Sequence, residues 1–168
     1  MRTCNELILN RSLSLNTKVI LAVIFLCTLC ICTTAAEIMD LIVLKPLQKV
    51  PSELTKLDGE DKLDEEDEVY EIDINSDGKR DYIAVYRKYC GAGSCPYGLL
   101  INQGTGFKSI PIGDCSSFFV ERKTTGGYFN IICGTRNSID RLSWNSKEYV
   151  IGRKLSPAEE NYIRKMNR

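Results

Sequence analysis

The sequence predicts a mainly β protein, in which an antiparallel sheet of hairpins forms a small sandwich, an open barrel or a propeller-blade-like unit, followed by a short C-terminal helix. From residue 68 onward, short runs rich in Val, Ile, Tyr and Phe are separated by Gly, Asn, Asp and Ser, which is typical of strands and tight turns. Near the end of the chain, residues 156–159 are instead typical of the first turn of a helix. With 168 residues, 43% of them hydrophobic, there is room for one packed domain and an export segment.

The N-terminal region has the layout of a signal peptide. Residues 19–32 form an uncharged apolar run of 14 residues, with basic residues before it and Thr and Ala residues after it. We expect residues 1–36 to be removed, which would make the mature protein periplasmic or secreted. The alternative is a membrane anchor, because residues 19–36 are 18 uncharged residues and a spanning helix needs about 20.

The next region is expected to precede the folded domain. Residues 37–57 show no clean period beyond a short strand or helix around 38–44. Eight of the eleven residues at 58–68 are acidic, and such a run is expected to be a solvated loop. We therefore assign residues 37–67 to an N-terminal segment and acidic spacer, and residues 68–168 to the β-rich domain.

The β-rich domain is expected to contain eight strands. Four of its turns are each followed closely by an aromatic residue that can cover one face of a sheet by cross-strand pairing: Tyr82, Phe107, Tyr128 and Tyr149. The expected strands are 68–73, 81–88, 97–102, 106–112, 117–122, 128–133, 140–144 and 148–152.

The C-terminal helix is predicted from its first turn. Ser156 and Glu159 have the spacing of a capping box, and Pro157 occupies the first helical position. Basic residues gather at the end of the chain, where the helix dipole favours positive charge. We expect a terminal helix of about three turns.

The cysteines predict disulfides. Four of the eight lie within residues 1–36, which leaves Cys90, Cys95, Cys115 and Cys133, and an even number in an exported chain indicates bridges. Four cysteines allow three pairings, and nearness in sequence favours Cys90 with Cys95 and Cys115 with Cys133. The alternative, a redox pair at 90–95, has four intervening residues where thioredoxin-type sites have two.

The chain contains no His, so Ser-His-Asp and Cys-His nucleophile systems and zinc-His sites are excluded. It carries no P-loop, dinucleotide fingerprint or nucleic-acid motif, and we expect no nucleic-acid partner. Residues 37–81 hold fifteen acidic and six basic residues, whereas residues 82–168 hold six acidic and thirteen basic ones. The two halves are expected to attract each other; a basic face for an anionic partner is the alternative.

One loop has the spacing of a calcium site. Oxygen-bearing side chains occupy loop positions 1, 3, 5 and 9, Gly78 occupies position 6, and a main-chain carbonyl at position 7 adds a ligand. Position 12 is Ala84 instead of the Glu of an EF-hand, and the residues that follow are strand-like. The expected ligands are Asp73, Asn75, Asp77, the carbonyl of Lys79, and Asp81.

The segment from Asp73 to Asp81, followed by Tyr82-Ile83-Ala84-Val85, resembles the calcium loops of FG-GAP/VCBS-type β repeats, in which an aspartate-rich loop joins two strands. More broadly, the chain looks like small exported bacterial β-rich proteins. That resemblance implies a periplasmic domain and brings no activity with it. The alternative interpretation is an ordinary turn, in which Asp side chains cap nearby main-chain amides.

These observations favour a non-catalytic domain that engages a protein partner in the cell envelope, as periplasmic inhibitors and immunity proteins do. The first alternative is a His-free enzyme acting on an envelope polymer, which needs a concave pocket with two facing carboxylates. Its candidate acids are Asp73, Asp77, Asp81, Asp114 and Glu121. The second alternative is a membrane-anchored structural or sensor protein, if residues 19–36 stay attached.

Overall fold

The computed structural model describes residues 39–55, 57 and 62–167. The predicted export signal and anchor therefore lie outside the described residues. Within these ranges, no helix has the length and apolarity needed to cross a membrane.

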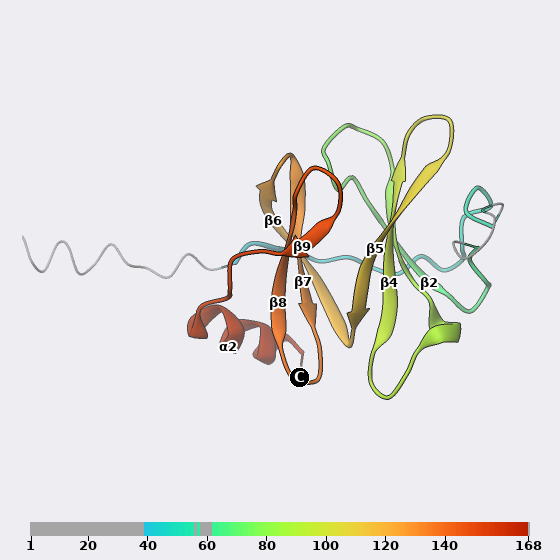
Figure 1. The fold of residues 1–168 in the computed structure, drawn as a ribbon. Coiled ribbons are helices and arrows are strands. Elements are labelled where there is room, and N and C mark those ends of the chain that lie inside the picture. Colours follow the sequence, from blue (N-terminus) through green and yellow to red (C-terminus); the bar gives the residue numbers. More distant parts are fainter. Residues whose placement is uncertain (1–38, 56, 58–61, 168) are drawn as a thin grey trace, which may run out of the picture. The chain divides into compact units, whose positions relative to one another are not determined.

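The fold is mainly β and ends in a short helix, which confirms the predicted class (Figure 1). All eight predicted strands are present, together with a two-residue strand at the start. The elements are β1 (Leu41–Ile42), β2 (Glu68–Ile72), β3 (Asp81–Val85), the 3-10 helix η2 (Arg87–Tyr89), β4 (Cys95–Asn102), β5 (Phe107–Cys115), β6 (Ser117–Thr125), β7 (Tyr128–Gly134), β8 (Ile139–Trp144), β9 (Tyr149–Ile151) and α2 (Pro157–Met166).

The strands form two antiparallel sheets, with orders β1-β6-β7-β8-β9 and β2-β3-β4-β5. Alternate side chains of each strand face the other sheet, as the two-residue period of a strand requires. The main core contains Ile83 and Leu99 from the four-stranded sheet and Val120, Ile131 and Leu142 from the five-stranded sheet. Among the predicted alternatives, the molecule is thus a small sandwich.

Helix α2 covers the outer face of the five-stranded sheet (Figure 1). Ser156 and Glu159 form the predicted capping box, and Pro157 begins the helix. Ile163 is fully buried against Ile132 and its neighbours. Local sequence signals therefore set where this helix begins, and one apolar stripe sets how it docks.

The described residues before β2 pack onto the sheets, whereas the sequence predicted an N-terminal segment and acidic spacer at 37–67. Leu54 and Leu63 are buried on the outer face of the four-stranded sheet, against Val69 and Leu100. Asp67 is buried too, and its carboxylate accepts hydrogen bonds from the main-chain N–H groups of residues 64 and 87. The acidic stretch therefore contains a buried apolar residue, Leu63, which helps to shield the outer face of the four-stranded sheet from water.

Residues 41–47 cross from one sheet to the other. Ile42 pairs with Val120 at the edge of the five-stranded sheet. A few residues later, the Leu47 N–H donates to the Val69 carbonyl at 2.8 Å, at the edge of the four-stranded sheet. This crossing segment, residues 41–47, therefore pairs with β6 over only two residues before it turns toward β2.

Both predicted disulfides are confirmed. Cys90–Cys95 closes the loop between η2 and β4, with 4.1 Å between the Cα atoms. Cys115–Cys133 joins the end of β5 to β7, with a Cα separation of 5.4 Å. Because β5 and β7 belong to different sheets, this second bridge links the two halves of the sandwich.

Candidate functional site

The predicted calcium loop connects β2 to β3. The Asp73 carboxylate accepts hydrogen bonds from the N–H groups of Asp77 (3.0 Å) and Gly78 (2.9 Å). The Asp77 carboxylate accepts one from the N–H of Lys79 (2.9 Å). Gly78 has a φ of 81°, a conformation that favours glycine. These bonds are those of a well-formed turn, and they hold the acidic side chains toward the loop interior.

Asp81 anchors this loop to the sheet. Its side chain is fully buried and accepts hydrogen bonds from the N–H groups of Ile74 (3.1 Å) and Asn102 (2.8 Å). The pKa of Asp81 is raised overall, mainly by burial and also by the charges of Asp77 and Asp73. The two main-chain hydrogen bonds act in the opposite direction but do not outweigh burial. The three carboxylates thus act electrostatically on one another.

A cation at this loop would relieve that repulsion. Within the part of the chain that the structure describes, no group of three or more Cys, Asp or Glu side chains is arranged to hold a metal ion. Calcium at Asp73, Asn75, Asp77, Asp81 and the Lys79 carbonyl therefore stays a prediction.

Calcium is expected to raise the thermal unfolding midpoint, because a ligand that binds only the folded state stabilises it by mass action. At calcium concentrations about ten- to a hundredfold above Kd, the free energy of unfolding should rise by about 1 to 3 kcal/mol. This corresponds to a rise in the midpoint of about 2 °C or more for a domain of this size. Calorimetry with and without millimolar calcium measures it. In the matched variant Asp77→Asn, which keeps an acceptor for the Lys79 N–H but removes the charge, the shift should shrink. An unchanged wild-type midpoint would contradict the prediction that this loop binds calcium.

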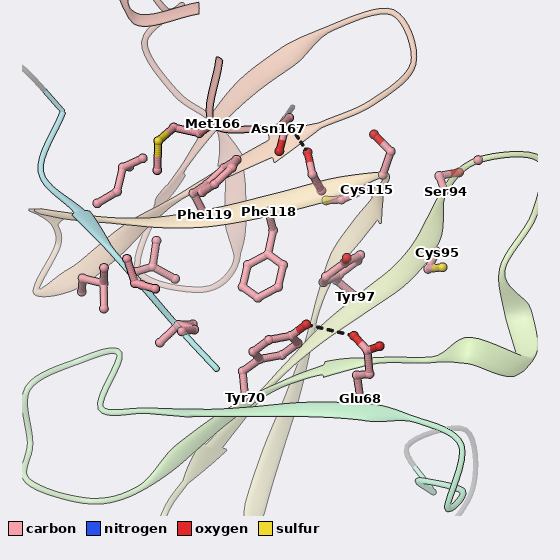
Figure 2. Close-up of a pocket in the computed structure, with 18 of the residues that line it drawn as sticks. Glu68, Tyr70, Ser94, Cys95, Tyr97, Cys115, Phe118, Phe119, Met166 and Asn167 are labelled. Carbon is pink, nitrogen blue, oxygen red and sulfur yellow. Dashed lines mark hydrogen bonds between the residues drawn. The ribbon is translucent and has the colours of Figure 1, made fainter. Parts of the chain in front are cut away.

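A second feature of the structure is a groove that opens where the crossing segment leaves β6, with a cavity volume of about 610 Å³ (Figure 2). We call it the β6 groove. Figure 2 shows Met166 and Asn167, at the end of α2, on the opposite side from Glu68 and Tyr70 of β2. It is lined by residues 41–44, Glu68, Tyr70, Arg87, residues 91 and 93–95, Tyr97, residues 115–120, Met166 and Asn167.

Three aromatic rings make up part of the wall of the β6 groove. The ring of Phe118 packs edge-on against Tyr70, with centroids 5.0 Å apart, and against Tyr97 at 5.1 Å. These rings come from β6, β2 and β4, so both sheets contribute to the wall. Each ring is half-buried. Such packed rings present a rigid apolar surface at a low entropic cost of ordering.

An ion pair lies beside these rings. The Glu68 carboxylate is paired with the Arg87 guanidinium and accepts a hydrogen bond from the Tyr70 hydroxyl at 2.9 Å. Burial raises the pKa of Glu68, but the bonds from Arg87 and Tyr70 outweigh it and lower the pKa overall. Burial, together with the bond to Glu68, raises the pKa of Tyr70. At neutral pH Glu68 is therefore charged, Tyr70 is neutral, and the charges of the pair cancel.

The rim of the β6 groove exposes apolar side chains to solvent. Val43 is 79% exposed and Met166 is 50% exposed. Asn167 fixes the end of α2 beside the groove, since its amide donates to the Ser117 hydroxyl at 3.0 Å. The disulfide loop closed by Cys90 and Cys95 borders another part of the rim. The hydrogen bond of Asn167 and the disulfide loop thus constrain the rim, on which Val43 and Met166 are exposed to solvent.

The acids that the sequence singled out as candidate catalysts do not line the β6 groove. Asp73 and Asp77 belong to the β2–β3 loop, Asp81 is the buried first residue of β3, and Asp114 lies near the end of β5. Glu121 is buried, and its carboxylate is bound by the Arg141 guanidinium at 2.8 and 2.9 Å. Of the described residues that line the groove, Glu68 is the one that carries a carboxylate. Sequence reasoning missed the groove, and the adjacent rings at 118 and 119 were its one local signal.

No known protein family, curated protein or solved structure matches this chain. The fold and the groove define it as a disulfide-bonded β sandwich, and the two bridges are consistent with an exported protein.

Proposed function

We propose that this chain is a non-catalytic domain of the cell envelope or the secreted fraction, and that it binds a protein partner as inhibitors and immunity-type proteins do. The observation that carries the proposal is the β6 groove, with its aromatic wall and its exposed Val43 and Met166. Covering apolar surface from water contributes about 25 cal/mol per Å². Aromatic side chains in a rigid setting are also typical of the residues that dominate binding energy at protein interfaces.

The state of the candidate acids supports binding over catalysis. A carboxylate-dependent hydrolase of an envelope polymer, the alternative function, needs two carboxylates that face one cavity. Among the described residues, the groove is lined by a single carboxylate, Glu68, which is held by Arg87 and Tyr70. Glu121 and Asp81 are buried in structural hydrogen bonds.

The proposal is tested by passing an envelope extract over the immobilised domain, with and without a calcium chelator. We expect a discrete protein to be retained, and mass spectrometry identifies it. A domain with residues 1–36 removed and both disulfides formed is the form to use. Retention of no protein would contradict the proposal, and degradation of an added polysaccharide or peptide that one acid substitution abolishes would favour the enzyme instead.

A further inference from the structure

Among the residues that the structure describes, no strand neighbours the edge of β6 beside the groove for three residues. β1 pairs with β6 only at Leu41–Glu121 and Ile42–Val120. Beyond Ile42 the crossing segment diverges toward β2. In the described part of the chain, Ser117–Phe119 therefore pair with β7 on one side and with no strand on the other. An open edge of this kind is a template for another extended chain.

The register shows which main-chain groups face the groove. The Arg122 N–H donates to the Asp40 carbonyl at 2.8 Å, on the β1 side of β6. Main-chain groups of an antiparallel strand point to the same neighbour at every second residue. Those of Val120 and Phe118 therefore face the same side as those of Arg122. The N–H and C=O of Phe118 are thus directed toward the groove, where an added strand would meet them.

The charges of the groove indicate what kind of segment fits. In the described part of the chain, the two charged residues that line it are Glu68 and Arg87, and their charges neutralise each other. Ten of the other eighteen residues that line it are aliphatic, aromatic or Met, and the rest are uncharged. Inserting an unpaired charge beside them would cost free energy, because it would lose hydration without gaining a partner. A segment without charges and with apolar side chains at alternate positions matches both the strand edge and the walls.

We infer that the open edge of β6 at Ser117–Phe119 and the groove beside it bind an extended, uncharged apolar segment of a partner protein, which adds to the five-stranded sheet as a strand next to β6. This inference rests on the proposed function and names the site and the kind of segment recognised. Main-chain hydrogen bonds supply affinity in this mode of binding, and the pockets for alternate side chains supply specificity.

The test uses a displayed library of random peptides about twelve residues long, a length that covers the edge and its flanks. Peptides selected on the oxidised domain should carry uncharged apolar residues at alternate positions. The variant Val43→Asp, which places a charge at an exposed rim position, should weaken their binding about tenfold or more. The matched control is Ile151→Asp, since Ile151 is also exposed, at 71%, but lies on β9 and does not line the groove.

Main-chain pairing is tested separately with N-methylated versions of one selected peptide. Methylation of alternate amides should abolish binding in one register and leave it unchanged in the other, because only one set of amides faces β6. Failure to select any peptide, equal binding to the Val43→Asp and Ile151→Asp variants, or indifference to methylation in both registers would overturn the inference. Dimers of the domain that Val43→Asp dissociates would identify a second copy as the occupant and would also overturn it.

The same variants separate this inference from the proposed function. If the domain retains an envelope protein and the Val43→Asp variant retains it equally well, the inference fails and the proposed function stands. If wild-type domain retains no envelope protein, the proposed function itself fails. Both variants change exposed side chains, so their thermal midpoints should stay close to that of the wild type.

Discussion

Replacement of Arg141 by Leu is expected to lower the free energy of unfolding by about 3 to 5 kcal/mol, the usual cost of removing one partner of a buried ion pair. Arg141 is buried between the five-stranded sheet and α2. Its guanidinium binds Glu121 through two hydrogen bonds and Glu159 through a third at 2.7 Å. The Asn130 amide donates to the same Glu121 carboxylate at 3.1 Å.

The loss of stability in the Arg141→Leu variant comes from the two carboxylates that it leaves behind, those of Glu121 and Glu159. Without Arg141, two carboxylates stay behind with their main cationic partner gone. Burial raises the pKa of Glu159, but bonds from Ser156 and Arg141 outweigh it and bring the pKa to about 2, so this group is charged at neutral pH. Urea denaturation measures the change. The control is Arg153→Leu, an exposed position outside any strand or helix, where we expect a change within about 0.5 kcal/mol. A loss below about 1 kcal/mol at Arg141 would contradict this account of how α2 is held.

The second large effect is expected from the bridge between the sheets. Changing both Cys115 and Cys133 to Ala should cost about 3 kcal/mol, because the unfolded chain regains the freedom of a loop 18 residues long. Both side chains are buried, so Ala avoids placing a new polar group in the core. Denaturant unfolding of the oxidised proteins measures the difference.

The bridge Cys90–Cys95 provides a matched comparison. Its sequence separation is only 5, so the double Ala variant at these positions should cost about 2 kcal/mol by the same reasoning. A larger loss at the short loop than at the long one would show that chain entropy does not govern these bridges. It would also indicate that the loop beside the β6 groove contributes more to the fold than its contacts imply.

Much of the fold could be predicted because its signals are local. The turn residues and the apolar runs mark all eight strands, and Ser156, Pro157 and Glu159 mark the start of α2. The contribution of residues 39–67 could not be predicted. Leu54 and Leu63 lie in a stretch without period, and they are buried only because the sheet brings Val69 and its neighbours together elsewhere in the chain.

The same distinction applies to the two candidate sites. The chemistry of the β2–β3 loop depends on spacing within nine residues, so Asp73 and Asp81 could be singled out directly. The β6 groove is assembled from β1, β2, β4, β6 and the end of α2. Its open edge exists because the crossing segment leaves β6 after two paired residues. Apart from the adjacent rings at 118 and 119, the groove has no local sequence signal, and the open edge has none, since both depend on register between distant segments.

The central claim is that this domain acts by binding at the β6 groove. The most direct measurement is hydrogen exchange of its main-chain amides, alone and in complex with the envelope protein it retains. We predict that exchange slows at residues 116–119 and 41–44, with the amide of Phe118 among the most protected. Unchanged exchange at these residues, with protection instead at the β2–β3 loop or at β9, would contradict the claim.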